Sequence, residues 1–515
     1  MKPESKLSSI AATPVYPILL PAYAILSLLA YNLGEIRPEA ALRSLMLAVG
    51  FALVSMWALK TYLRDLHKAA FVSGAFSFLF FTYGHIRLAS AGAAWSRATV
   101  LVPVWIVLFA LTFFIVYRSR WSFSGVSLVL NGIWLIAVGL TLYQMVTYEA
   151  RILRGMEAAG ASLGPVKTAV AEGSDALPDI YYFILDSYAR ADTLQDAYGY
   201  DNSEFLDSLE ALGFFIGSCS QSNYDRTELS LASSLNMEYI QALHPELTGA
   251  NRDKLPLWAL IQHSRVRKIL EDNGYTTVTF ATGFTWSELR DADQFIEPDL
   301  PFGVLSEFEV LVLRTTFMKG LQELGLVHYQ AQEFERYLER TQLILERLPE
   351  LSAQAGPQFY FVHILEPHPP FVFNPDGTPA DGGSYLNDLG KYTPETYARG
   401  YLSELQFINH AVLDLVRGLI DDASIPPVII IQGDHGPWFQ SSRYTMPNLN
   451  AYYLPGHADQ LYPAVTPVNS FRIVFNAYLG TDYPLYEDRS YDSPDTEPYN
   501  YALVPNQCPP KVPEG

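Results

Sequence analysis

Five side chains that could hold a metal ion or a charged substrate lie at the ends of apolar runs. Asp186 follows the run 179–185. His363 lies within the run 358–365, and His368 follows it. Asp434 and His435 come after the run 427–432. Carboxylates and imidazoles from different strands can converge on one divalent cation with mixed oxygen and nitrogen ligands. These residue types therefore indicate metal-assisted chemistry.

Taken singly, three of these residues also have ordinary structural explanations. Asp186 could cap the helix that follows its strand, and His363 could be a hydrogen-bonded histidine of the core. His368 lies in Pro-His-Pro-Pro, an exposed turn setting that packing explains less well.

The pair Asp434-His435 is the stronger signal because glycines flank it. We expect Gly433 and Gly436 to let the backbone turn tightly around the two side chains.

Thr227 is the candidate nucleophile. It lies where a loop beginning at Ser222 becomes a helix, and amides at a helix start favour an alkoxide and a phosphoryl oxygen. Thr227 could equally be an N-cap, which Glu228 in the first turn would suit. Ser222 and Ser230 are competing hydroxyls.

The elements that must position these residues alternate between strands and helices. The expected strands are 179–185, 275–281, 358–365 and 427–432, and the expected helices are 206–212, 266–272, 334–348 and 396–420. This alternation predicts an α/β domain with a central, mostly parallel sheet. Ligands of such sheets gather outside the carboxyl ends of the strands, where the candidate residues lie.

Charge divides the 515-residue chain into two parts. Residues 1–150 hold 11 Lys and Arg against 5 Asp and Glu, a balance of +6, whereas residues 151–515 hold 23 against 49, a balance of −26. The acidic part disfavours a nucleic-acid partner. Disorder is disfavoured because 49% of residues are hydrophobic, and two cysteines exclude a disulfide-built scaffold.

The basic part contains five long uncharged windows and is predicted to be a five-span α-helical membrane bundle. The windows are 7–34, 44–59, 69–86, 98–117 and 121–148. With a cytoplasmic amino terminus, the inner segments carry seven basic residues and the outer loops four, which favours that orientation. The bundle could be a simple anchor or could handle lipid.

These features divide the chain into four segments. We expect a five-span transmembrane domain over 1–150, a linker with an interfacial helix over 151–178, a catalytic domain over 179–481 and an acidic tail rich in Pro and Tyr over 482–515. The tail is expected to wrap the domain surface.

The motifs, taken in order, resemble the alkaline phosphatase/sulfatase superfamily in its membrane-anchored branch, which includes lipoteichoic acid synthases and phosphoethanolamine transferases. The resemblance covers about residues 179–480. It rests on Leu185-Asp186-Ser187, Asn223-Tyr-Asp-Arg-Thr227, Pro367-His368-Pro-Pro-Phe371 and Gly433-Asp434-His435-Gly436. It implies an alkaline-phosphatase-like fold and a multi-pass protein of the plasma (inner) membrane whose catalytic domain lies outside the cytoplasm.

The resemblance also implies a role for each candidate residue. One divalent metal ion (Mn, Zn or Mg) would be held by Asp186, Asp434, His435 and the hydroxyl of Thr227, which would be the nucleophile. Substrate-binding and acid-base roles would fall to the remaining residues: His368 would bind anionic oxygens or protonate the leaving group, Arg226 would bind phosphate, and His363 would bind substrate or metal.

Three features depart from the family pattern. Asp186 stands where the branch often has Glu, and the extra ligands of two-metal phosphatases are not located; His457 lies in what looks like an ordinary turn. The sequence after Cys219 lacks the residues that follow the modified Cys or Ser of sulfatases, so formylglycine chemistry is disfavoured. Cys219 and Cys508 could pair in an oxidising compartment or remain two buried thiols.

The expected function is transfer of phosphoglycerol or phosphoethanolamine from a phospholipid donor to a glycan or lipid acceptor through a covalent intermediate on Thr227. A hydrolase of the same superfamily, or a non-catalytic membrane protein with a degenerate hydrolase domain, is the alternative.

Overall fold

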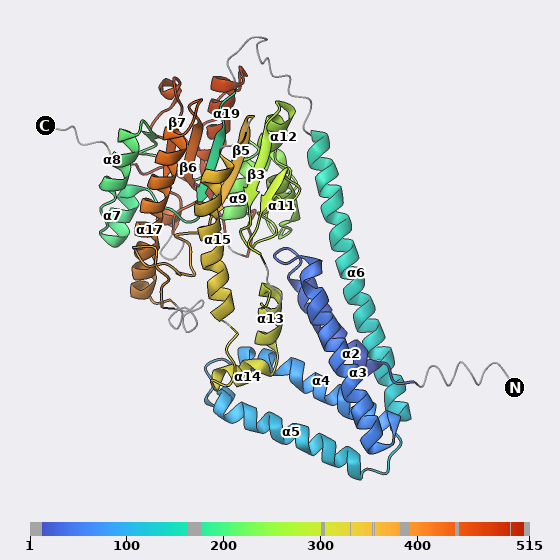
Figure 1. Ribbon diagram of the computed structural model, residues 1–515. Helices are drawn as coiled ribbons and strands as arrows, with labels where there is room; N and C mark the ends of the chain where they lie inside the picture. Colours follow the sequence, from blue (N-terminus) through green and yellow to red (C-terminus); the bar gives the residue numbers. More distant parts are fainter. Residues whose placement is uncertain are drawn as a thin grey trace. The chain divides into compact units, whose positions relative to one another are not determined.

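The chain forms two compact units (Figure 1). The computed structural model describes residues 13–162, 177–299, 304–329, 331–352, 354, 356–381, 392–437, 442–494 and 496–508. One unit comprises Met1–Arg151 and Leu300–Glu333, and the other comprises Ile152–Asp299 and Phe334–Gly515. We call them the helical unit and the α/β unit.

The helical unit contains the expected apolar helices. They are α2 (Tyr16–Tyr31), α3 (Leu42–Leu63, preceded by the 3₁₀ turn Pro38–Ala41), α4 (Leu66–Ala89), α5 (Ala98–Arg118) and α6 (Ser124–Ser162). Four of them are long and apolar enough to cross a membrane, and α2 is a shorter apolar helix. Residues 7–12 of the first expected window lie outside the described part of the chain.

Helix α6 continues beyond its expected span. Residues 155–162, which the composition assigns to a linker, extend this helix to Ser162. Alanine is a strong helix former, and the stretch contains no proline before Pro165, so nothing in it stops the helix. The rest of the expected linker, 163–176, lies outside the described residues.

A second segment of the helical unit comes from the middle of the sequence. Helices α13 (Glu307–Thr315) and α14 (Met318–Glu323) belong to Leu300–Glu333, which the sequence division placed in the catalytic domain. The ion pair Arg87–Glu323 at 3.0 Å links α4 to α14, and the amide of Phe317 donates to the Phe80 carbonyl at 2.8 Å. We call residues 304–329 the return segment.

The α/β unit is built on a seven-stranded sheet with the order β2-β7-β6-β1-β5-β3-β4. The strands are β1 (Ile180–Leu185), β2 (Phe215–Ile216), β3 (Thr276–Phe280), β4 (Gln294–Ile296), β5 (Gln358–Ile364), β6 (Val428–Gly433) and β7 (Asn450–Tyr453). Strands β6, β1, β5, β3 and β4 pair in parallel, whereas β7 is antiparallel to β6 and to β2. The sheet is therefore mixed, with the expected strands forming its parallel centre.

Helices cover both faces of the sheet. They are α7 (Ala191–Tyr198), α8 (Ser203–Ala211), α15 (Ala331–Leu351) and α17 (Pro394–Asp421) on one face, and α9 (Thr227–Ser234), α11 (Leu255–Gln262), α12 (Arg265–Asp272) and α19 (Pro467–Tyr478) on the other. The short helices are α10 (Ile240–Leu243) and α18 (Ser442–Thr445). Strand β1 serves both layers: Ile180, Tyr182 and Ile184 join one core cluster, and its other three residues join the second.

The end of the chain is tied back to the α/β unit. Strands β8 (Ser490–Asp492) and β9 (Ala502–Val504) form a small antiparallel sheet, and a disulfide joins Cys219 to Cys508. The cysteines are therefore paired, one of the two arrangements that the sequence left open.

The glycines around Asp434 have a different role from the expected one. Neither Gly433 nor Gly436 has a positive φ. Instead, a Cβ atom at Gly433 would lie 2.2 Å from the Tyr188 carbonyl oxygen, and one at Gly436 would lie 2.3 Å from that of Tyr444. These glycines permit close approach of the backbone. The left-handed residue of the region is Ser187, with φ 64°.

Gly433→Ala should destabilise the α/β unit by about 1–3 kcal/mol, because the added methyl group collides with backbone that cannot move aside as a side chain would. Thermal unfolding of the purified full chain measures the change. The matched control is Gly418→Ala in α17, where nothing lies within 4 Å of the added Cβ; it should leave stability unchanged or raise it. An equal melting temperature for Gly433→Ala and wild type would contradict the close-approach role.

Candidate metal centre

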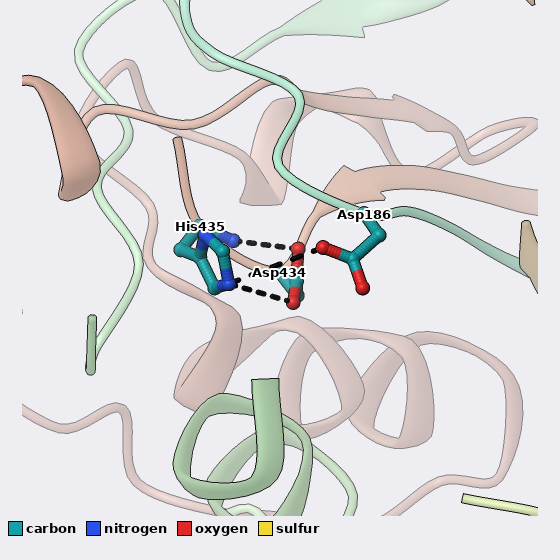
Figure 2. Close-up of side chains that lie close together, drawn as sticks. All are labelled: Asp186, Asp434 and His435. Carbon is teal, nitrogen blue, oxygen red and sulfur yellow. Dashed lines mark hydrogen bonds and ion pairs between the residues drawn. The ribbon is translucent and has the colours of Figure 1, made fainter. Parts of the chain in front are cut away.

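Two buried carboxylates and an imidazole meet at the carboxyl end of the central strands (Figure 2). The parallel register pairs Leu185 of β1 with Gly433 of β6, so the next residues, Asp186 and Asp434, come side by side. Ligand atoms of Asp186, Asp434 and His435 all lie within 4.8 Å of one another, and all three residues are buried. The structure thus brings together the three ligands that the strand ends indicated.

The backbone orients Asp434 and His435 directly. The Oδ1 atom of Asp434 accepts from the amides of Ser187 and His435, each at 2.9 Å. The Nδ1 atom of His435 lies 2.7 Å from the Gly436 carbonyl oxygen. Because a carbonyl oxygen can only accept, Nδ1 carries the proton, and Nε2 faces the carboxylates.

The electrostatics of this group favour a cation. Burial and the neighbouring charge of Asp186 raise the pKa of Asp434. Burial also opposes ionisation of Asp186, but the charges of His368, His363 and His435 outweigh it and hold the pKa of that carboxyl below its usual range. Two carboxylates confined together in a buried site repel each other unless positive charge lies between them.

The donor set fits a divalent metal ion. Among the described residues, Oδ2 of Asp434 is buried and accepts no hydrogen bond, and it lies 3.4 Å from Nε2 of His435. An unpartnered buried carboxylate oxygen is unfavourable unless it coordinates a cation. Two carboxylates and one imidazole nitrogen match the ligand preferences of zinc or manganese, and a threonine hydroxyl is available beside them.

Two hydroxyls contact this group: that of Ser187, which donates to Oδ1 of Asp186 at 3.1 Å, and that of Thr227. Thr227 is the first residue of α9, after Arg226 in the N-cap position, and its Oγ1 lies 3.2 Å from Nε2 of His435. The competing hydroxyls point elsewhere: Ser222 donates to the Tyr224 carbonyl at 2.7 Å, and Ser230 donates to the Asp434 carbonyl at 2.7 Å. The structure therefore separates Thr227 from the two serines, which the sequence could not do.

The structure also answers the simple explanations for Asp186 and His363. The next helix, α7, begins five residues after Asp186 with Arg190 as its N-cap, so Asp186 is not a cap. His363 is buried on β5 with Nε2 3.5 Å from Oδ2 of Asp186. Neither ring nitrogen has a hydrogen-bond partner in the described part of the chain. His363 is thus not a hydrogen-bonded core histidine, and it faces the metal-binding group.

His368 lies half-buried beyond the end of β5. Its loop is clamped by Glu404 of α17, whose carboxylate accepts from the amides of Val372 and Phe373, the latter at 3.2 Å. Glu366 is buried two residues before His368, and its two carboxyl oxygens lie 2.9 and 2.8 Å from the Thr341 hydroxyl. Neither glutamate stands out in the sequence, because nothing in the chain marks Glu404 as a partner of a loop over thirty residues away.

Arg226 contacts the end of the chain. Its Nη2 donates to the Ser493 carbonyl at 2.8 Å, and its Nε lies 3.7 Å from Oδ2 of Asp225. Burial and the Asp492 carboxyl raise the pKa of Asp225 to about 7. The residues expected to form a surface tail therefore contact Asp225 and Arg226, the two residues before Thr227. His457, by contrast, packs edge-to-face on Tyr478 with ring centroids 4.9 Å apart, as an ordinary turn residue does.

No family model and no curated protein matches the sequence. Several solved structures are similar. The C-terminal periplasmic domain of phosphoethanolamine transferase EptC from Campylobacter jejuni is 13% identical, with 64% of this chain and 96% of that chain covered and a TM-score of 0.39. The corresponding EptC domain from Escherichia coli in complex with Zn is 12% identical, with 67% and 96% covered and a TM-score of 0.41.

A structure that includes the membrane part is similar as well. The integral membrane protein lipooligosaccharide phosphoethanolamine transferase A from Neisseria meningitidis is 13% identical, with 91% of this chain and 95% of that chain covered and a TM-score of 0.39.

Asp434→Asn should weaken divalent-metal binding by more than about 100-fold. The substitution removes a charged side chain expected to coordinate the ion directly, and even residues that only hydrogen-bond to a ligand contribute about 10- to 100-fold. Metal-stripped full-length protein is titrated with Zn²⁺ or Mn²⁺ against a chromophoric chelator. Asp207→Asn, at an exposed position on α8, is the control and should bind as wild type does. Unchanged affinity in Asp434→Asn would remove this residue from the ligand set.

Glu366 should make the stability of the metal-free protein depend on pH. Burial raises its pKa to about 7 from the ordinary value of 4.5. Between these two pH values the folded chain holds a proton that the unfolded chain has released, so stability is lost as pH rises through this window.

Glu366→Gln should therefore unfold at a higher temperature than wild type at pH 8, by the equivalent of about 2 kcal/mol, and nearly equally at pH 5. Melting curves recorded with a chelator present test this expectation. The exposed residue Glu210, as Glu210→Gln, is the control. A stability difference that is the same at both pH values would show that Glu366 does not titrate in this window.

Proposed function

We propose that this protein is a membrane-anchored, metal-dependent transferase that moves phosphoglycerol or phosphoethanolamine from a phospholipid to a glycan or lipid acceptor. The observation that carries the proposal is the Thr227 hydroxyl, 3.2 Å from His435 at the start of α9 and beside the buried carboxylates. A nucleophilic hydroxyl next to a strong cation site is the arrangement that phosphoryl transfer requires.

Thr227 Oγ1, which has lost its proton to solvent beforehand and reacts as the alkoxide, attacks the phosphorus of the donor head group. The bond between phosphorus and the diacylglycerol oxygen breaks, and a phosphodiester forms on Thr227. A divalent ion held by Asp186, Asp434 and His435 supplies the positive charge that lowers the pKa of the hydroxyl and neutralises charge on the phosphoryl oxygens.

His368 donates a proton to the departing diacylglycerol oxygen. In the second step it takes the proton of the acceptor hydroxyl as that oxygen attacks phosphorus, and Thr227 is regenerated. His363, whose Nε2 lies 3.5 Å from Oδ2 of Asp186, binds substrate oxygens or the metal. Arg226 is a weaker candidate for phosphate binding, since its guanidinium already contacts Asp225 and Ser493.

The membrane topology belongs to the same proposal. We infer five spans, with α2 as the first, and a cytoplasmic amino terminus, which leaves the α/β unit on the outer side of the plasma membrane. The pairing of Cys219 with Cys508 supports this side, because disulfides persist in oxidising compartments outside the cytoplasm.

Thr227→Ala should lower turnover of a fluorescent phospholipid to background, a loss of at least about 1,000-fold, because it removes the proposed nucleophile, the hydroxyl that lies 3.2 Å from Nε2 of His435. The measurement is product formation by the full chain in lipid nanodiscs. The matched control is Thr378→Ala, a threonine in an exposed loop, which should retain wild-type turnover.

Mass spectrometry of wild type incubated with the donor should find the head group on Thr227. An adduct on Ser222 or Ser230 would overturn the assigned nucleophile. Release of free phospho-alcohol, with no transfer to added glycan or lipid, would identify a hydrolase. Absence of both adduct and turnover in metal-loaded protein would favour the non-catalytic alternative.

A further inference from the structure

The helical unit contains a cavity of about 280 Å³ that the proposed reaction does not use. Its walls come from α2, α3, α4 and the return segment. The lining includes Leu47, Ala48 and Phe51 of α3, Phe81 of α4, and Leu305 and Glu309 of the return segment.

The wall supplied by the return segment is held firmly against the spans (Figure 1). A Cβ atom at Gly84 of α4 would lie 2.3 Å from the Thr315 carbonyl carbon, so α13 and α4 approach at backbone distance. The ring of Phe317 packs edge-to-face on Tyr83 with centroids 5.3 Å apart. The cavity is therefore a built feature and not a loose gap between helices.

Two polar groups in the wall, the Glu309 carboxylate and the Thr316 hydroxyl, are hydrogen-bonded within the protein, and the other polar lining residues are Ser44 and Ser77. Glu309 closes a capping box with Ser306, whose amide donates to Oε2 at 2.8 Å, and both of its carboxyl oxygens accept from Arg43. The Thr316 hydroxyl donates to the Leu313 carbonyl at 2.9 Å. Water needs two to four polar partners to occupy a cavity, and the apolar lining offers it few.

The surroundings of the cavity are apolar as well. Leu47 and Phe51 on its rim are 67% and 69% exposed on α3, a helix long and apolar enough to cross a membrane. In a bilayer these side chains meet hydrocarbon. Arg43, in the first turn of α3, pairs with Glu309 of the cavity wall, and its side chain is 36% exposed. A basic side chain at a helix end can reach the head-group layer of a bilayer.

We propose that this cavity binds one acyl chain of a diacyl phospholipid. The apolar lining and the exposed apolar rim on α3 match the hydrocarbon tail of such a lipid. Arg43 does not offer a free charge to the phosphate, because its guanidinium already donates to Glu309 and to the Val304 carbonyl. This site lies within the helical unit and goes beyond the proposed transfer reaction: the lipid can occupy it whether or not Thr227 forms an adduct.

Photocrosslinking tests the proposal. Full-length protein in nanodiscs receives a diacyl phospholipid with a diazirine in one acyl chain, and peptide mapping locates the label. Labelling should concentrate on residues 304–317. Ala48→Phe places an aromatic ring in the cavity. It should reduce this labelling about tenfold, which is the loss of binding expected when about two methylene groups of the acyl chain can no longer be buried. Ala58→Phe, at an exposed position of the same helix, should not change it.

Each contrary result would overturn the site. Undiminished labelling in Ala48→Phe, or labelling of residues 304–317 no stronger than that of the exposed face of α5, would mean that no acyl chain enters the cavity. More effective competition by an acylated glycolipid than by unlabelled phospholipid would assign the cavity to a different lipid. A thermal melt of Ala48→Phe confirms folding. The Thr227 adduct, measured separately with a short-chain soluble donor, keeps failure of this site distinct from failure of the proposed reaction.

Discussion

Repulsion between two buried carboxylates is the constraint around which the α/β unit is organised. Strand β1 lies between β6 and β5, and its register with β6 places Asp186 beside Asp434 at the carboxyl edge of the sheet. Neither residue is accessible to water that could screen its charge. Such a pair is stable only when positive charge lies beside it. The imidazole of His435 can provide part of this charge, and a divalent cation bound between the side chains can provide the rest.

Much of the surrounding structure keeps this arrangement in place. Ser187 adopts a left-handed conformation, with its amide on Asp434 and its carbonyl accepting from the Tyr401 hydroxyl at 2.9 Å. Gly433 lets the Tyr188 carbonyl approach β6. Long helix α17 contributes both Tyr401 and Glu404, which clamps the loop after His368. One helix thus orients groups that follow two different strands, so the site depends on the packing of α17 as much as on the sheet.

The helical unit contains segments from both the basic and the acidic part of the sequence. The charge imbalance therefore indicates where the apolar helices lie, but it does not identify every segment that packs against them. Arg43 lies in the basic half of the chain, yet it pairs with Glu309 from the acidic half. Counted as separate halves, these charges suggest an anchor of one sign and a domain of the other. In the folded chain, part of the acidic sequence returns to neutralise a basic residue at a helix end, and in doing so closes a cavity.

The sequence alone determined the elements whose signal is local. The apolar run of β1 predicted a strand buried on both faces, and the alternation of strands and helices predicted the parallel centre of the sheet. The strand ends indicated Asp186, Asp434 and His435 as neighbours, because parallel strands bring their carboxyl ends to one edge. The uncharged windows predicted the apolar helices for the same reason: hydropathy and length act within one segment.

Tertiary structure decided what depends on distant residues meeting. It separated Thr227 from Ser222 and Ser230 by the direction of three hydroxyls, and it brought Asp492 and Ser493 to Asp225 and Arg226, the residues before Thr227. It added Glu366 and Glu404 to the site, added β7 and β2 as antiparallel edge strands, and moved residues 304–329 into the helical unit. No local pattern encodes these outcomes, because each arises from packing between segments that are far apart in the chain and from the hydrogen bonds that only this packing permits.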